Sequence, residues 1–241
     1  MTILSSAPRQ SELIPILCAV FNFGFCPKEL DKLFRLAEGE ALLLLRDLHS
    51  VLKIQSSEDE ISSHHASFVD FLKHPDRSGT FCIDILNNQI PLARSLLQFY
   101  AGPFQRNEIR LLSRLISFIV SLPPSGAVAE LFPLIASVNP DHIFDPKEYQ
   151  SRYNDFECIV PWLKKNPSAP ADVIQLWEDY AFIFSIDNIR YGESTPSIKH
   201  NVSPSPELLC ILVSLRLLGH RLLALPTKLD LTWDRSQNCS V

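Results

Sequence analysis

Three histidines and an aspartate lie close together in the sequence, at His64, His65, Asp70 and His74. Asp70 and His74 are four residues apart, so on a helix they share one face and could bind a divalent metal or transfer protons. A second interpretation is that His74, which directly precedes Pro75, only donates to the last free carbonyl groups of a helix. The second interpretation is favoured because no HExxH or comparable ligand spacing is present, and we expect no metal site.

Sequence motifs for the common catalytic sites are absent. The chain contains no GxSxG motif and no phosphate-binding loop of the form GxxxxGKS or GxxxxGKT. A hydrolase that uses His65 and Asp70 remains an alternative that rests on those two residues alone. We therefore expect a protein that is not an enzyme, with no catalytic residues and no cofactor of its own.

The composition indicates a folded protein that does not bind nucleic acid. Its 241 residues are enough for one large or two small domains. Hydrophobic residues make up 46% of the chain and charged residues 20%, which excludes an intrinsically disordered protein. The net charge of -5 provides no general electrostatic attraction to a nucleic acid.

Cysteine usage and hydropathy indicate a cytoplasmic protein. The six cysteines are scattered and include no CxxC pair, which suits a reducing compartment rather than a disulfide framework. The N-terminus lacks the positive region expected before a signal sequence. Residues 207–225 are apolar, but Arg216, His220 and Arg221 interrupt them, and the clean apolar run is about half of the ~20 residues that a bilayer needs. A membrane span is therefore not expected.

Hydrophobic periodicity and turn residues predict three helices and a β-hairpin in the first 84 residues. Gly24 ends the first helix, Pro27 opens the second, and the polar turn SSEDE separates the two strands. Three helices followed by a hairpin are the plan of a winged helix. The predicted helices cover residues 11–22, 27–37 and about 39–50, the predicted strands residues 51–55 and 61–64, and a helix at 66–73 and a strand at 80–84 follow.

The third predicted helix, EGEALLLLRDLHS, would be the recognition helix of a DNA-binding winged helix. Base and phosphate contacts need Lys, Arg, Asn or Gln on an exposed face. This helix offers a single arginine, two glutamates and an aspartate, and leucines fill most of the rest. It is therefore predicted to pack against protein rather than to read DNA.

After residue 84 the predicted secondary structure consists of helices alone. Helical stripes of apolar residues recur over residues 92–99, 108–122, 127–138, 171–184 and 207–225. The predicted fold is mainly α, with an N-terminal winged helix followed by an all-helical array. The predicted domains are a winged-helix-like domain at residues 11–84, a helical domain at residues 85–225 and a tail at residues 226–241.

Three stretches of the sequence resemble one known family. LLLLRDLHSVLKI, ISSHHASFVDFL and HPDRSGTFCID resemble the segment that follows the NACHT module in fungal STAND-type NTPases. In those proteins the segment is typically a winged helix with a variant of the pattern LHxSFxDFLxDPxRSGxFxVD. The resemblance covers about residues 12–84, with SFxDFL, PxRSG and FxID in the same order. Further on, FIVSLPPS, DFECIVPWL and LWEDYAFIF resemble the helical continuation of such chains.

The resemblance implies a regulatory role for His65. In related nucleotide switches, a winged-helix histidine at the start of this helix reaches the phosphate of bound ADP and holds the inactive form. His65 occupies the matching position, five residues before Asp70. An imidazole can carry a positive charge near neutral pH, which suits a contact with a phosphate. The best-known relatives carry aspartate directly after this histidine, whereas this chain has Ala66. The alternative interpretation is that His64 and His65 only end a strand of the hairpin.

The nucleotide-binding module of that family is missing from this sequence. With no phosphate loop and no acidic Walker B strand, we expect ADP or ATP to bind only when the chain is joined to such a module. The chain is therefore predicted to be a non-catalytic regulatory and interaction segment of a NACHT/STAND-type signalling protein, with the NACHT module or other proteins as partners. The alternative is a stand-alone helical scaffold for protein interactions with no link to a nucleotide.

Overall fold

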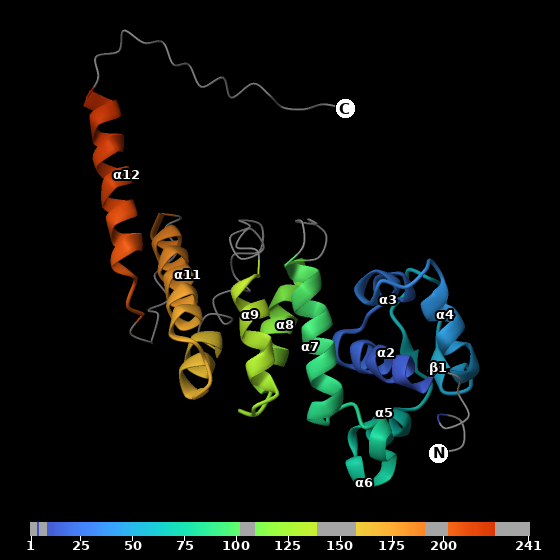
Figure 1. Cartoon of the computed structure of the whole chain (residues 1–241). Coiled ribbons are helices and arrows are strands. Elements are labelled where there is room, and N and C mark those ends of the chain that lie inside the picture. Colours follow the sequence, from blue (N-terminus) through green and yellow to red (C-terminus); the bar gives the residue numbers. More distant parts are fainter. Residues whose placement is uncertain (1–3, 5–8, 102–108, 139–157, 191–201, 225–241) are drawn as a thin grey trace, which may run out of the picture. The chain divides into compact units, whose positions relative to one another are not determined.

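The computed structural model describes residues 4, 9–101, 109–138, 158–190 and 202–224 of the chain. Over this range the protein is mainly helical, with one small antiparallel sheet, which confirms the prediction of a mainly α fold (Figure 1). The winged helix at its N-terminus stays a prediction. Two compact units are present, residues 1–202 and residues 203–241. The predicted boundary after residue 84 falls inside the first unit and stays a prediction, and the predicted tail lies outside the described residues.

Up to residue 73, the first part of the N-terminal unit contains the predicted helices and hairpin in the predicted order. The third predicted helix is shorter than expected, because it changes to a 3-10 turn at Arg46, and the strands contain two residues each. The helix predicted at residues 66–73 is confirmed with the same bounds. The elements are α2 (Gln10–Phe23), α3 (Pro27–Phe34), α4 (Glu40–Leu45), η1 (Arg46–Leu48), β1 (Leu52–Lys53), β2 (Ser62–Ser63), α5 (Ala66–Lys73), α6 (Pro75–Ser78) and η2 (Gly79–Phe81).

The strand predicted at residues 80–84 is wrong. Pro75 starts the short helix α6, and a 3-10 turn, η2, follows it directly. Gly79 joins the two with φ 58° and ψ −123°, a backbone conformation that is open essentially to glycine alone. The N–H of Ile83 then donates to the carbonyl of Leu72 at the end of α5, 2.9 Å away. The apolar run is therefore buried by a turn that folds back on α5, not by pairing in a sheet.

A buried carboxylate connects α3 to the start of α4. Gly39, the residue before α4, has φ 80° and offers no side chain to cap the helix. The carboxylate of Asp31 in α3 takes this role, because it accepts hydrogen bonds from the N–H of Gly39 at 2.7 Å and of Ala41 at 2.8 Å. Asp31 is 8% exposed, so these bonds fix the angle between the two helices in a nearly dry environment.

The rest of the N-terminal unit is helical. The helix predicted at residues 127–138 is interrupted, because its first turn is 3-10 and a new helix begins at Phe132, directly before Pro133. The elements are α7 (Leu86–Tyr100), α8 (Ile109–Ser121), η3 (Val128–Leu131), α9 (Phe132–Ala136), a helix at residues 158–165, and α11 (Ala171–Arg190).

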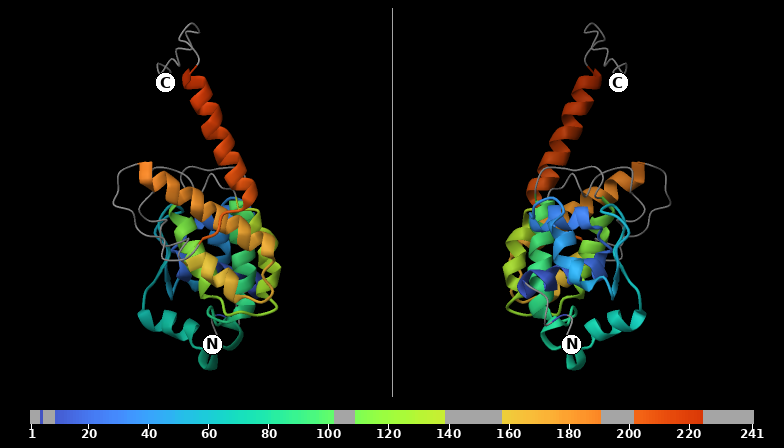
Figure 2. Two further views of the ribbon diagram at one scale, coloured as in Figure 1. Left: turned by 90° about the vertical axis from the view of Figure 1, so that its left-hand side faces the viewer. Right: turned by 90° about the vertical axis from the view of Figure 1, so that its right-hand side faces the viewer.

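One hydrophobic core runs through both parts of the N-terminal unit. The most extensive contact between two elements joins α2 to α7, which lie side by side in Figure 1. At the end of α2, the rings of Phe23 and Phe118 pack edge to face with centroids 5.2 Å apart. Figure 2 shows α5 and α6 at one end of this packed group, and each of these two helices buries a single side chain, Leu72 and Ser78.

The C-terminal unit is described from residue 203 to residue 224 and contains α12 (Pro206–Ala224). The hydroxyl of Ser205 caps it by accepting the N–H of Leu208 at 3.2 Å. Four large apolar side chains of this helix are exposed, namely Leu209, Ile211, Val213 and Leu215. Within the described residues, no helix is both long enough and apolar enough to cross a membrane.

Candidate functional site

The structure separates the four clustered side chains of residues 64–74. The ring of His74 bonds to its own helix, because its Nδ1 lies 2.6 Å from the carbonyl oxygen of Asp70 and donates to it. This confirms the prediction that His74 satisfies a free carbonyl at a helix end. The carboxylate of Asp70 is exposed and takes no part in that bond. In the described ranges, no group of three or more His, Cys, Asp or Glu side chains is placed to hold a metal ion.

His65 stands at the start of α5 with its side chain free. Its backbone is extended, with φ −135° and ψ 132°, and its carbonyl accepts the N–H of Phe68 at 3.0 Å. The side chain is exposed and makes no capping hydrogen bond to the helix. His65 is therefore the residue that precedes the first turn of α5, and the free N–H groups of that turn favour negative charge.

His64 lies one residue earlier and faces a different region. Its N–H donates to the carbonyl of Val51 at 2.9 Å, which continues the pairing of the β1–β2 hairpin by one bond. Its ring lines an open pocket of about 450 Å³ between the hairpin and the end of α4. The two adjacent histidines therefore lie at different places, with His64 at the pocket and His65 at the start of α5.

The pocket combines an apolar floor with a cationic rim. Leu42 and Leu45 of α4 contribute to the floor, together with Leu52 of β1 and Ile54, which directly follows β1. The rim carries basic side chains from three elements, and its neutral polar residues come from the hairpin turn. The basic residues are Arg46, His49, Lys53 and His64, and the neutral polar residues are Gln55, Ser56 and Ser57.

No acidic side chain lines the pocket. The nearest carboxylate along the chain is that of Asp47, 3.6 Å from Nε of Arg46. Two acidic residues of the hairpin turn have partners of their own. Glu58 pairs with Lys28 at 2.6 Å, and Asp59 accepts a hydrogen bond from the hydroxyl of the pocket residue Ser56 at 2.8 Å. The hydrogen bond that Lys28 donates to the carboxylate of Glu58 raises the pKa of the Lys28 ammonium.

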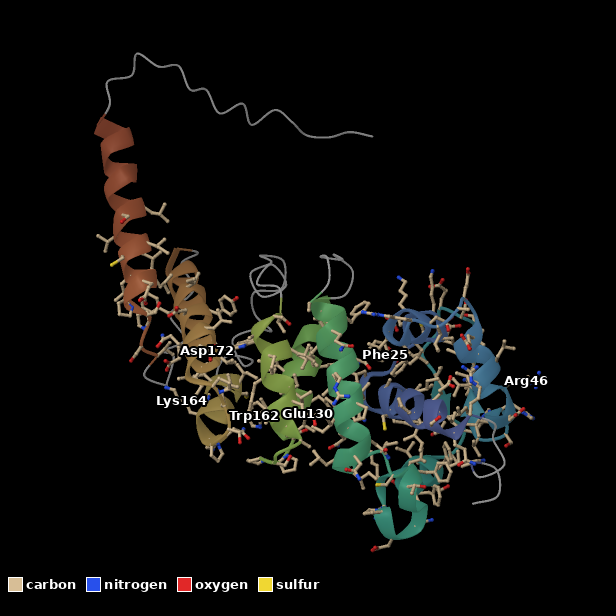
Figure 3. The ribbon with its side chains drawn as sticks, in the orientation of Figure 1. Phe25, Arg46, Glu130, Trp162, Lys164 and Asp172 are labelled. Carbon is tan, nitrogen blue, oxygen red and sulfur yellow. The ribbon has the colours of Figure 1, made fainter. Side chains whose placement is uncertain are left out.

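The basic side chains of the rim are largely uncommitted. In the part of the chain that the structure describes, the side chains of Lys53 and His64 have no hydrogen-bond or ion-pair partner. Arg46 is exposed over 76% of its side chain, and Figure 3 shows it directed away from the helices. His49 uses Nδ1 to donate to the carbonyl of Arg46 at 3.1 Å, which leaves Nε2 free.

His49 lies near the histidine cluster in the sequence, but no sequence motif assigns Arg46, His49 or Lys53 to a site. The spacing of Arg46 and His49 on one helical turn is a local signal, but a three-residue spacing occurs on many solvated helix faces. Lys53 and His64 come together only through the pairing of Leu52 with Ser63 in the hairpin. The register of that hairpin is needed to bring the four basic residues to one pocket.

Comparison with protein-family models, with curated proteins and with solved structures finds no match to this chain.

Proposed function

We propose that this chain is a non-catalytic regulatory and interaction segment of a NACHT/STAND-type signalling protein. In this proposal the elements from α2 to η2 form a winged helix that contacts a nucleotide-binding module, and the helices from α7 onward carry the response to partner proteins. The observation that supports the proposal is the continuous core between these two parts, centred on α2 and α7.

A continuous core provides mechanical coupling. Close-packed interiors deform little, so a displacement of α2 by a bound module has to be taken up by α7 and α8. Two contacts at the end of α2 strengthen this connection. Phe23 packs on Phe118, and the guanidinium of Arg114 donates to the carbonyl of Phe23 at 2.5 Å. A flexible linker between the two parts would transmit no such movement.

The position of His65 supports the same proposal. A regulatory contact with a phosphate needs a side chain that is exposed, unpaired within its own domain and next to helix N–H groups. His65 meets these requirements at the start of α5. The side chain that follows is Ala66, so any further polar contact to a nucleotide would have to come from the module.

The decisive experiment is to sequence the full-length transcript and the genomic region upstream of Met1. An in-frame phosphate-binding loop of the form GxxxxGKS or GxxxxGKT upstream would support the proposal. An authentic start codon at Met1 with no such loop upstream would contradict it, and the stand-alone scaffold for protein interactions would then be the better function.

A biochemical test uses the 241-residue chain itself. We expect no ATP hydrolysis and no change in melting temperature with ADP at low micromolar concentration. A clear thermal shift with ADP would contradict the proposal, since it would place a complete nucleotide site within this chain. If a module is found upstream, His65→Ala in the joined protein is expected to weaken ADP binding, with His64→Ala as the matched control.

A further inference from the structure

The pocket between α4 and the β1–β2 hairpin has the composition of a binding site for an amphipathic anion. Its volume of about 450 Å³ is in the range of small ligand sites, and its floor is lined by leucine and isoleucine side chains. Its four basic rim residues come from η1 and the residue after it, from β1 and from the end of the hairpin, and no carboxylate is among the residues that line it. A site that combines an apolar floor with basic side chains at its rim favours a ligand that carries both an apolar group and a negative charge.

We infer that this pocket binds an acidic segment of a partner protein, with a carboxylate on Arg46, Lys53 and His64 and a neighbouring apolar side chain on the leucine floor. The inference rests on the proposed function in taking a protein as the ligand.

The local backbone favours a carboxylate over a phosphate group. Phosphates are typically held at the N-termini of helices or by glycine-rich loops. The pocket lies instead at the carbonyl end of α4 and η1, where the carbonyl of Arg46 already accepts a hydrogen bond from His49, and no glycine lines it. This end of a helix carries partial negative charge, which opposes a doubly charged phosphate more than a single carboxylate.

The surrounding charge favours a short segment over a nucleic acid strand. Asp47 follows Arg46 directly, and the turn that lines the pocket continues into Glu58, Asp59 and Glu60. A duplex that reached the rim would bring its phosphates close to these carboxylates. A peptide with a few acidic residues can place them in the pocket and leave the acidic flanks in solvent.

The test measures the binding of fluorescein-labelled peptides to the full chain by fluorescence anisotropy. The probe is the peptide DEDLFDED, and the control peptides are DEDSSDED, without the apolar pair, and NQNLFNQN, without charge. We expect saturable binding of the probe with a Kd below about 100 µM and binding of each control at least about tenfold weaker.

Charge-reversed variants locate the site. The double variant Arg46→Glu/Lys53→Glu is expected to weaken probe binding at least about tenfold. Lys73→Glu/Lys165→Glu changes the net charge equally at two exposed lysines outside the pocket and is expected to bind the probe within about twofold of the unchanged chain. All four side chains are exposed, and the melting temperature of each variant verifies that it is folded.

Three results would overturn the inference. They are the absence of saturable binding, an equal loss of binding in both double variants, and displacement of the probe by duplex DNA at lower concentration than by unlabelled peptide. The last result would assign the pocket to nucleic acid. None of these results bears on the presence of an upstream nucleotide module, so this inference and the proposed function can fail separately.

Discussion

The guanidinium of Arg114 in α8 donates a hydrogen bond to the backbone carbonyl of Phe23, the last residue of α2, with Nη1 2.5 Å from the oxygen. The two residues are 91 positions apart in the sequence. The carbonyl lies at a helix C-terminus, where it has no partner within α2, and the positive charge of Arg114 complements the helix dipole there. One side chain thus joins the end of the first helix to the helical region.

Replacing Arg114 with alanine is expected to lower the free energy of unfolding by about 1–2 kcal/mol, the value of a hydrogen bond from a charged donor to a partly buried carbonyl. Urea denaturation followed by circular dichroism measures this change. The matched control is Arg94→Ala, which removes an exposed ion pair with Glu130 and is expected to cost less than about 1 kcal/mol. An equal effect of the two substitutions would show that the bond to Phe23 adds nothing to stability.

Gly79 is expected to be sensitive to substitution for a purely conformational reason. Its φ of 58° and ψ of −123° strain any residue with a side chain, while a Cβ built there meets no atom within 4 Å. Gly79→Ala should therefore lower the free energy of unfolding by about 1–3 kcal/mol, again measured by urea denaturation. Gly126 also has free space around a built Cβ but no positive φ, so Gly126→Ala should be neutral or slightly stabilising. A neutral Gly79→Ala would contradict this backbone assignment.

The two short elements around Gly79 show where sequence reasoning reached its limit. The helix at residues 66–73 could be predicted, because its apolar spacing is regular and Pro75 marks its end. The apolar run of residues 81–83 has no period of its own, since three residues fit a strand and a turn equally well. Its conformation depends on the backbone hydrogen bond from the N–H of Ile83 to the carbonyl of Leu72. This contact joins two segments and cannot be predicted from the local sequence pattern.

Only part of the candidate site could be predicted, because the rest also depends on contacts between separate segments. His64, His65 and His74 attract notice as residue types, and the bond from His74 to the carbonyl of Asp70 follows from its place at a helix end. Whether His64 or His65 faces the pocket depends on which residues pair across the hairpin. A shift of one residue in a strand turns each side chain to the opposite face. Composition alone gives no information on that register.

Asp31 is expected to be important for stability although it belongs to no catalytic or binding motif. Its two carboxylate oxygens accept separate N–H groups, from Gly39 and from Ala41. Asp31→Asn keeps one acceptor oxygen and should cost about 1 kcal/mol, whereas Asp31→Ala removes both bonds and should cost about 2–3 kcal/mol. Thermal unfolding followed by circular dichroism measures the series. The control is Asp47→Asn, at an exposed position, which should change the stability little. Equal stability of the Asp31 variants and the unchanged chain would contradict the capping role.

The cysteines are expected to differ in reactivity according to burial. Cys18 in α2 is fully buried, and its Sγ donates to the carbonyl of Ile83 at 3.8 Å. Burial raises the pKa of the Cys18 thiol from 9.0 to about 12, with a smaller contribution from the negative charge of Asp84. The thiolate fraction at pH 8 is therefore about a thousandfold lower than that of an ordinary thiol. Cys158 and Cys210 are exposed.

Timed alkylation with iodoacetamide at pH 8, read by mass spectrometry of tryptic peptides, measures these differences. Cys158 and Cys210 should be modified within minutes, and Cys18 should stay unmodified until urea unfolds the chain. Because the raised pKa favours the protonated thiol in the folded state, stability should fall as the pH rises from about 9 toward 12, and Cys18→Ala should reduce that fall. Modification of Cys18 as fast as Cys210 in the native protein would mean that the segment carrying Ile83 does not stay closed over α2. The shared core would then open too readily to couple the two parts of the N-terminal unit.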